Sequence, residues 1–214
     1  MKQIKHIIWD WNGTILDDTK LCVDIINSML TKRNKSTITE KIYSDIFDFP
    51  VKKYYQKAGF EFQKESFENL SMEYMSIYEK RKYECNLHSY FLNIQPLIKS
   101  KGIKQSILSA YAEEYLIDIL SYFSILDNFI YVSGLKHILA DSKIDNGIKL
   151  IEKINVPKKN CIFIGDTIHD IDAAEAMKIE YCLLPSGHNS MQRLKSRTDK
   201  IIRNFTDIYQ RLSI

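Results

Sequence analysis

The segment Asp10-Trp11-Asn12-Gly13-Thr14 follows an apolar run over residues 5–9, and Gly165-Asp166-Thr167-Ile168-His169-Asp170 follows another apolar run far along the chain. Each segment places carboxylates just past the end of a predicted buried strand. Ligands of open parallel sheets bind beyond the carboxyl ends of the strands. The two segments therefore predict one acidic pocket at the edge of one sheet.

Length and composition predict a globular protein. The chain has 214 residues and a formal net charge of +3, enough for one large domain or a domain with an insertion. Its Lys and Glu residues are scattered, so we expect no nucleic-acid partner. Its apolar runs are shorter than a membrane span and no signal-peptide core is present, which predicts no membrane partner and a cytoplasmic location. The sequence gives no indication of the oligomeric state.

Strand and helix patterns alternate along most of the chain. Buried-strand patterns cover residues 5–9, 104–108, 129–132, 161–164 and 181–184. Helical patterns cover residues 90–100, 113–122, 147–154 and 171–177. Such alternation implies right-handed crossover connections. The predicted fold class is therefore α/β, with a parallel sheet covered by helices on both faces.

A helical module is predicted between the first and second strands. Helical patterns begin at Asp18 and continue over residues 40–47, 51–58 and 64–83. We expect residues 16–87 to form a helical cap domain, and residues 1–15 and 88–214 to form the core domain. The break at Gly59 is expected to place a loop near the mouth of the pocket.

Asp10 is the candidate nucleophile. A carboxylate that attacks phosphorus forms an aspartyl-phosphate and divides hydrolysis into two steps. Gly13 allows the backbone to approach a ligand closely, and Thr14 can donate its hydroxyl to a phosphate oxygen. These neighbours favour a catalytic role over the capping role that a lone aspartate after a strand usually has.

A second pair of carboxylates, Asp166 and Asp170, lies on a predicted strand-to-helix turn, where Asp170 also suits a capping role. Together with Asp10 they are expected to converge on one pocket. Two carboxylates about 4 Å apart repel by roughly 4 kcal/mol at an effective dielectric constant of about 20. Mg²⁺ removes this penalty and favours one or two carboxylates together with substrate phosphate. The pattern therefore predicts a Mg²⁺-dependent phosphoryl-transfer site.

Three further residues are suited to binding phosphate. Ser109 is predicted to end the second sheet strand with Ala110 beside it, which offers a hydroxyl and a backbone N–H. Lys143 precedes the helical pattern over residues 147–154 and supplies a point charge for a phosphate dianion. We therefore expect these residues to join Asp10 in the pocket.

These residues resemble the four motifs of the haloacid dehalogenase (HAD) superfamily. Asp10-x-Asn12-Gly13-Thr14, Ser109, Lys143 and Gly165-Asp166-x-x-x-Asp170 occur in the family's order over essentially the whole chain. The resemblance implies a Rossmann-like core with an α-helical cap domain inserted after the first motif, as in phosphoglycolate phosphatase-like members.

By motif position, the resemblance also implies roles. Asp10 would be the nucleophile and a Mg²⁺ ligand, the backbone carbonyl of Asn12 a second ligand, and Asp166 a third. Asp170 would hold a water bound to the ion. The leading hypothesis is a phosphatase of a small phosphorylated metabolite that works through an aspartyl-phosphate, with Ser109 and Lys143 binding the phosphoryl oxygens and the cap excluding water.

Two residues depart from the family pattern. Asn12 replaces the aspartate of the phosphatases, and Ile144 replaces a proline that often follows the motif lysine. Phosphonoacetaldehyde hydrolases share a tryptophan after the nucleophile and no acid two residues on, and Lys52, Lys53 and Lys57 are candidates for the Schiff-base lysine of those enzymes. A catalytically weak HAD protein that binds a phosphorylated ligand is a further alternative, supported by Asn12.

The amide of Asn12 can donate a hydrogen bond but cannot transfer a proton at ordinary pH. Poor alkoxide leaving groups should therefore depart slowly, whereas acyl and aryl phosphates should be affected less. A histidine is one way to replace the missing acid. His169 lies within the second acidic segment, and His188 follows the Pro185-Ser186-Gly187 turn.

Overall fold

A five-stranded parallel sheet forms the centre of the computed structural model, which describes all residues except 1–2, 137–141, 204 and 213–214. The strands lie in the order β5-β4-β1-β6-β7, and all four pairings are parallel. Their bounds are β1 His6–Trp9, β4 Lys104–Ala112, β5 Tyr131–Leu135, β6 Cys161–Gly165 and β7 Glu180–Leu183. Since Trp9 pairs with both Ile107 and Ile164, the ends of β1 and β6 lie side by side.

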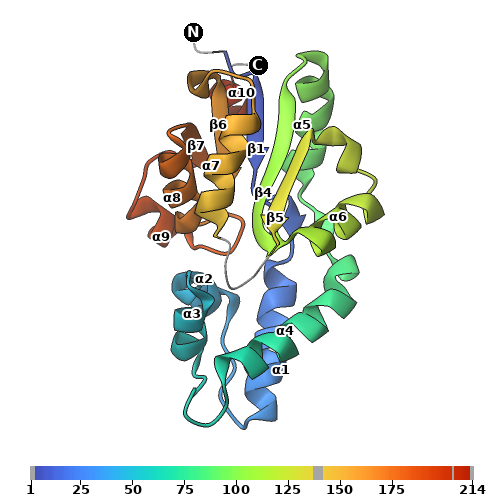
Figure 1. Cartoon of the computed structure of the whole chain (residues 1–214). Helices are drawn as coiled ribbons and strands as arrows, with labels where there is room; N and C mark the ends of the chain where they lie inside the picture. Colours follow the sequence, from blue (N-terminus) through green and yellow to red (C-terminus); the bar gives the residue numbers. More distant parts are fainter. Residues whose placement is uncertain (1–2, 137–141, 204, 213–214) are drawn as a thin grey trace.

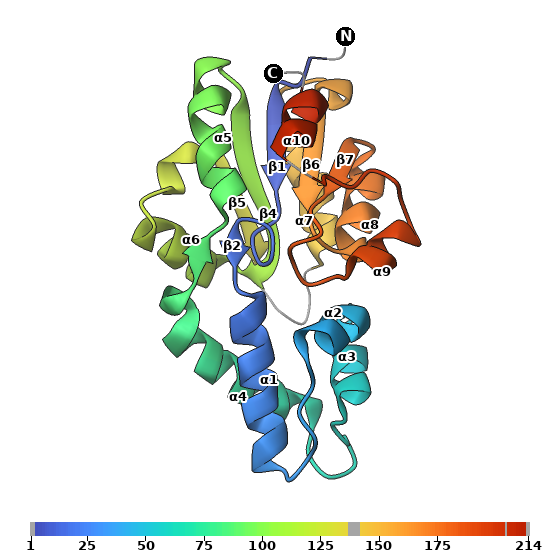
Figure 2. The same ribbon diagram turned by 180° about the vertical axis from the view of Figure 1, so that it is seen from behind.

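Helices cover both faces of this sheet (Figures 1 and 2). They are α5 Ser89–Ser100, α6 Glu113–Tyr122, α7 Lys143–Lys153, α8 Ile168–Met177, α9 Met191–Lys195 and α10 Phe205–Leu212, with short 3₁₀ turns at Lys82–Glu84, Leu126–Asn128 and Lys158–Asn160. Ile7 and Trp9 belong to one apolar core and Ile8 to another, because successive strand residues point to opposite faces. The predicted α/β class with a Rossmann-like parallel sheet is confirmed.

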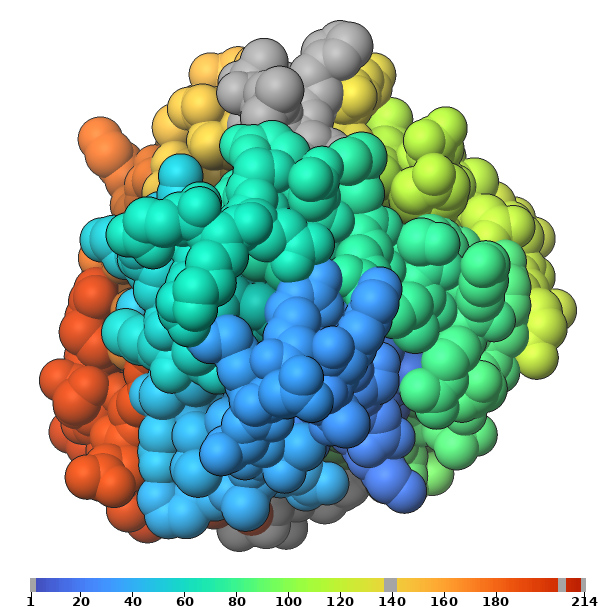
Figure 3. All heavy atoms as spheres, turned by 90° about the horizontal axis from the view of Figure 1, so that it is seen from below, coloured from blue at the N-terminus to red at the C-terminus, as the bar shows by residue number. Residues whose placement is uncertain are grey.

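Four helices between β1 and β4 lie beyond the carboxyl edge of the sheet (Figure 1). They are α1 Thr19–Lys32, α2 Glu40–Ile46, α3 Val51–Ala58 and α4 Phe67–Arg81, and they are preceded by β2 Leu16–Asp17 and followed by β3 Asn86–Leu87. The antiparallel pairing of β2 with β3 sets Leu16 opposite Leu87, so the chain leaves the sheet and returns to it at one point. In the view from below in Figure 3, residues of this insertion cover the middle of the face that is seen.

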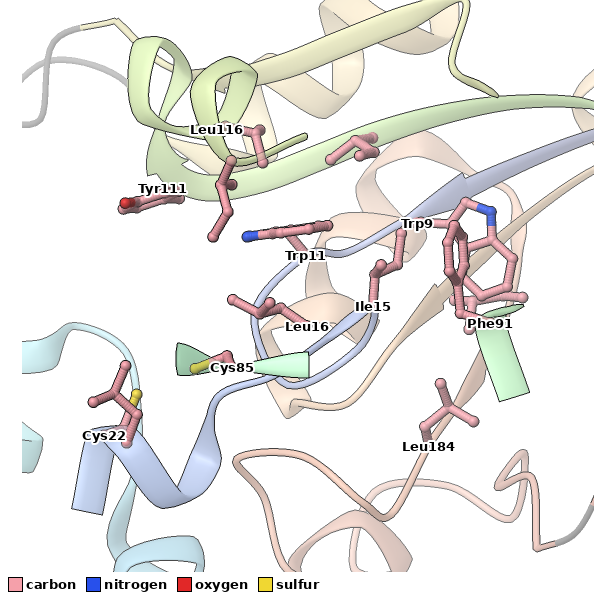
Figure 4. Close-up of a cluster of buried hydrophobic side chains, with 14 of the residues drawn as sticks. Trp9, Trp11, Ile15, Leu16, Cys22, Cys85, Phe91, Tyr111, Leu116 and Leu184 are labelled. Atoms are coloured by element: carbon pink, nitrogen blue, oxygen red, sulfur yellow. The ribbon is translucent and has the colours of Figure 1, made fainter. Parts of the chain in front are cut away.

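Apolar anchoring fixes the loop that follows β1. Trp9 packs edge-on against Phe91 of α5, with ring centroids 5.5 Å apart, and Trp11 is fully buried among core residues (Figure 4). The Trp11 carbonyl accepts hydrogen bonds from the backbone N–H groups of Thr14, Ile15 and Leu16. The loop is therefore a compact turn that is anchored in the core by the buried indole of Trp11.

Several element bounds differ from those expected. β4 continues through Ala112 with a pairing irregularity after Leu108, so Ser109 lies within the strand instead of ending it. α7 begins at Lys143 because the Ser142 hydroxyl accepts a hydrogen bond from the Asp145 N–H, a capping signal that the helical pattern over residues 147–154 did not contain. β5, at Tyr131–Leu135, lies further along the chain than the strand predicted over residues 129–132. α4, at Phe67–Arg81, is shorter than the helix predicted over residues 64–83.

The elements β2, β3, α9 and α10 were not predicted. β2 and β3 have two residues each and α9 has five, which is too few for a periodic pattern. Among the helices of the described ranges, none combines the length and the apolar character needed to cross a membrane.

Candidate active site

Three buried carboxylates meet at the carboxyl edge of the sheet. Asp10 follows β1, Asp166 follows β6, and Asp170 lies in the first turn of α8. One carboxylate oxygen from each lies within 4.8 Å of the others, and each residue is at most 6% exposed. The predicted convergence of two distant acidic segments on one pocket is therefore present in the structure.

Lys143 joins this cluster from the opposite side. It is the first residue of α7, and its buried Nζ donates to Asp10 Oδ1 and, at 2.5 Å, to Asp170 Oδ1. The other oxygen of Asp170 accepts from the backbone N–H groups of Asp166 and Thr167 and from the Thr167 hydroxyl. Both oxygens of Asp170 thus accept from protein donors, Oδ2 from three and Oδ1 from Lys143, and Asp170 completes a capping box with Thr167.

The electrostatics of the cluster follow from burial and crowding. Burial raises the pKa of Asp10 well above its ordinary value, with the neighbouring Asp170 and Asp166 adding to the rise against the opposing charge of Lys143. Burial likewise raises the pKa of Asp166 to about 6. For Asp170 burial acts in the same direction, but Lys143 and the backbone donors outweigh it and lower the pKa. One lysine therefore does not neutralise the three carboxylates, and a cation would find a favourable site.

Asp166 is held by close backbone approaches. Its oxygens accept from the Thr14 hydroxyl at 2.7 Å and from the backbone N–H of His188 at 2.6 Å. A Cβ on Gly187 would lie 2.1 Å from the Asp166 carboxylate, and one on Gly13, whose φ is +72°, would lie 2.5 Å from it. The Thr14 hydroxyl therefore positions a carboxylate in this structure, and its contact with phosphate stays a prediction.

A second polar cluster adjoins the first, and the sequence patterns did not predict it. Asp18, where the first helical pattern was predicted to begin, makes no capping bond to α1 and is fully buried. Its carboxylate accepts from Asn12 Nδ2 at 2.7 Å, from the Gly13 backbone N–H at 2.9 Å and from the Tyr78 hydroxyl at 2.8 Å. Asn12 also donates to Tyr78 at 2.6 Å, so both amide protons are engaged.

His188 completes this second cluster. Its Nε2 lies 3.3 Å from Asp18 Oδ1, and its Nδ1 lies 2.8 Å from the Tyr43 hydroxyl. Burial alone would lower the pKa of His188, but the adjacent Asp18 raises it to about 9. The other histidine candidate, His169, stacks on Phe49 with ring centroids 4.6 Å apart, and burial lowers its pKa. Of the two, the structure brings His188 next to Asn12's partner Asp18.

A cavity of about 1100 Å³ opens from the carboxylate cluster toward the inserted helices. Asp10, Asn12, Ser109, Ala110 and Lys143 line it, so all of the predicted catalytic and phosphate-binding residues except Thr14 lie at this cavity. The Ser109 hydroxyl also accepts from the backbone N–H of Tyr111 at 3.1 Å.

Gly59 lies at the end of α3 in the left-handed conformation and is not among the residues lining this cavity. The expectation of a Gly59 loop at its mouth is therefore wrong. The helices α2 and α3 line the cavity instead, through Tyr43 and Tyr54 among others. Lys52, Lys53 and Lys57, the candidates for Schiff-base chemistry under the alternative hypothesis, are exposed and do not line it.

Comparison with known proteins places this geometry in a family. The family model of haloacid dehalogenase-like hydrolases matches residues 7–184. No match is found among curated proteins. Similar solved structures include a hydrolase of the haloacid dehalogenase-like family from Streptococcus pneumoniae, with a TM-score of 0.82 and 17% identity over 99% of both chains.

Two other solved structures are similar at equally low identity. A predicted phosphoglycolate phosphatase from Haemophilus somnus gives a TM-score of 0.77 and 22% identity over 98% of both chains. Protein tyrosine kinase A from Mycobacterium tuberculosis gives 0.83 and 18% over 100% of both chains. Since these names differ in activity, the likeness shows the fold alone.

The ion pair between Asp18 and His188 predicts a pH-dependent stability. Because the pKa of His188 rises from 6.5 to about 9 on folding, the stabilisation is fully present below about pH 6.5 and is lost as the pH rises through about 9. Such a rise corresponds to about 3 kcal/mol. Asp18→Asn also disturbs the hydrogen bonds of Asp18 with Asn12, Gly13 and Tyr78 at every pH. It should therefore lower the free energy of unfolding by about 3 kcal/mol more at pH 6 than at pH 10.

Urea denaturation in EDTA measures this difference, with Asp24→Asn on the exposed side of the same helix as the control. A loss that is equal at both pH values would show that His188 is not charged through Asp18.

Proposed function

Because this chain belongs to the haloacid dehalogenase-like hydrolases, we propose that it is a Mg²⁺-dependent phosphatase acting on a small phosphorylated compound. The observation that carries the proposal is the convergence of Asp10, Asp166 and Asp170 with Lys143 in one buried cluster at a cavity. Clustered titratable groups with perturbed pKa values in a cleft are typical of catalytic sites.

Asp10 is the nucleophile of this proposal. Its carboxylate attacks phosphorus and forms an aspartyl-phosphate, while the electron pair of the broken P–O bond goes to the leaving oxygen. Lys143 favours the ionised form of Asp10 and offsets the charge of the phosphoryl oxygens. Ser109 and the backbone of Ala110, at the same wall of the cavity, bind those oxygens.

The donor set fits a hard divalent cation, because buried carboxylates with raised pKa values lack compensating charge. Asp10, Asp166 and the backbone carbonyl of Asn12 would hold Mg²⁺, which when bound supplies positive charge to the phosphoryl oxygens. Asp170 Oδ2 is taken by protein donors, whereas Oδ1 accepts from Lys143. Asp170 therefore holds Lys143, and its Oδ1 would orient a water on the ion.

The inserted helices act as a cap in this proposal, with residues 16–87 as the cap domain and residues 1–15 and 88–214 as the core domain. Support comes from the antiparallel pairing of β2 with β3. Because of this pairing, the chain enters the inserted helices and leaves them at the same place. Cap residues also supply most of the far wall of the cavity. Closure of such a cap excludes water during the first chemical step.

Carbon–phosphorus cleavage of the phosphonoacetaldehyde hydrolase type has little support, since the cap lysines do not reach the cavity. The weakly catalytic alternative depends on Asn12, whose two amide protons are bound to Asp18 and Tyr78. Hydrolysis of acetyl phosphate in the presence of Mg²⁺ distinguishes an enzyme from a protein that only binds phosphorylated ligands.

Mg²⁺ should raise the melting temperature of the wild-type protein. At a concentration of about 100 times Kd the ion contributes about 2.7 kcal/mol, or roughly 5–10 °C for a chain of this size. Asp166→Asn should abolish most of this shift, because the carboxylate is a proposed ligand. Asp172→Asn, an exposed carboxylate two residues beyond Asp170 on α8, is the matched control. A Mg²⁺ response that survives in Asp166→Asn would refute the ligand assignment.

Asn12→Asp should accelerate hydrolysis of an alkyl phosphate by at least about tenfold, because it restores a group that can protonate the leaving oxygen. In the wild type the second step also lacks its base, so aspartyl-phosphate should accumulate as a burst during acetyl phosphate turnover. Rapid-quench kinetics measure both effects.

The contact of Asn12 with Asp18 suggests a matched design. Asn12→Asp alone sets two carboxylates against each other, whereas Asn12→Asp combined with Asp18→Asn keeps the hydrogen bond with the donor reversed. Asp18→Asn alone is the control. Fast alkyl phosphate turnover without a burst in the wild type, unchanged in the paired variant, would assign the proton transfer to another group.

A further inference from the structure

The cavity is larger than a phosphate site requires. Pockets for drug-sized ligands typically occupy about 300–1,000 Å³. The cavity of about 1100 Å³ runs without interruption from Asp10 and Lys143 at the sheet edge to Phe67 and Met75 on α4. A leaving group much larger than a two-carbon acid is needed to fill it.

Aromatic side chains form much of its wall. They come from the α2–α3 region, from α4 and from the end of β4, and they include Phe47, Phe49, Tyr54, Phe67, Tyr78 and Tyr111. Several pack edge to face: the centroids of Phe47 and Tyr54 are 5.2 Å apart, and those of Tyr78 and Tyr111 are 5.8 Å apart. Walls of this kind favour a flat apolar ring over an extended polar chain.

The charges at this wall do not suit an anionic leaving group. Each cationic side chain among the described lining residues faces a carboxylate: Lys143 contacts Asp10 and Asp170, Lys136 lies 3.7 Å from Glu113, and His188 Nε2 lies 3.3 Å from Asp18. On the cap side the ionised groups are acidic, with Glu68 on α4 at the lining. A second carboxylate or phosphate on the substrate would find no cationic partner among the described cap residues that line the cavity.

Asn12 restricts the substrate independently of the cavity. Because its amide cannot protonate the leaving oxygen, the leaving group must depart without help from that residue. A phenol departs as a phenolate far more readily than an alcohol departs as an alkoxide. The ring nitrogens of His188 are occupied by Asp18 and by the Tyr43 hydroxyl. Apolar aromatic walls and an Asn12 that cannot donate a proton therefore converge on one chemical class.

We propose that the substrate is an aryl phosphate monoester whose phenol is uncharged, a proposal that rests on the phosphatase function above. The P–O bond to the ring oxygen breaks and the phenolate takes its electron pair, while Asp10 forms the new bond to phosphorus. Water then cleaves the aspartyl-phosphate to inorganic phosphate, and the phenolate takes up a proton. The sum of the steps is the ester plus water giving a phenol plus phosphate.

Four substrates separate ring size from leaving-group acidity in the wild-type protein with Mg²⁺. Phenyl and 2-naphthyl phosphate release phenols of similar acidity, so the added ring tests the cavity. It buries on the order of 50 Å² more apolar surface, which should lower KM about fivefold to tenfold. Benzyl phosphate keeps the ring but releases an alkoxide and should show a lower kcat. Phosphoglycolate should have the lowest kcat/KM.

A positive charge introduced into the cavity wall tests the preference for an uncharged aromatic leaving group. Met75→Lys should raise KM for 2-naphthyl phosphate at least fivefold and lower KM for phosphoglycolate. Ile42→Lys, at an exposed apolar position of α2 that does not line the cavity, is the matched control and should change neither value. If Met75→Lys does not fold, the four-substrate series in the wild-type protein still tests the proposal.

Acetyl phosphate distinguishes failure of this inference from failure of the proposed function. Its hydrolysis, together with equal KM values for phenyl and 2-naphthyl phosphate or a preference for phosphoglycolate, would overturn the aryl assignment and leave the phosphatase function intact. No hydrolysis of any of these compounds, acetyl phosphate included, would overturn both.

Discussion

The structure depends on placing three carboxylates and one ammonium group together out of water. Carboxylates about 4 Å apart repel by roughly 4 kcal/mol even at an effective dielectric constant of about 20. Lys143 relieves part of that repulsion by donating to Asp10 and Asp170, which requires α7 to begin at that residue. The close approach of Gly187 and Gly13 to Asp166 leaves its carboxylate one position. The backbone at the carboxyl edge of the sheet is therefore shaped to hold these charged side chains.

Charges of opposite sign alternate across the pocket. Lys143 lies between Asp10 and Asp170, and the backbone and ring of His188 link Asp166 to Asp18. Asn12 is a neutral donor next to Asp18, where an aspartate would add a buried carboxylate at hydrogen-bond distance from another. The fully buried Asp18 thus gives a structural reason for the amide at position 12.

The sequence predicted the sheet and the three acidic residues because both depend on local patterns. Buried strands such as Cys161–Gly165 are continuous apolar runs, and carboxylates that follow parallel strands share one edge. Asp18 and Tyr78 could not be assigned in this way, since their meeting depends on how α1 and α4 pack. The start of α7 was readable from Ser142-x-x-Asp145, but the apolar pattern outweighed that polar cue.

The amide of Asn12 and the aromatic wall of the cavity together restrict the leaving group of the substrate. An alkyl leaving group would fit the apolar surface but would need a proton that Asn12 does not supply. An acyl phosphate needs no proton, yet its carboxylate product would carry a localised charge among apolar rings. A phenolate spreads part of its charge into its ring, and the ring suits an aromatic wall that includes Phe47 and Tyr54. Of the three leaving groups, only the phenolate satisfies both the wall and the missing acid.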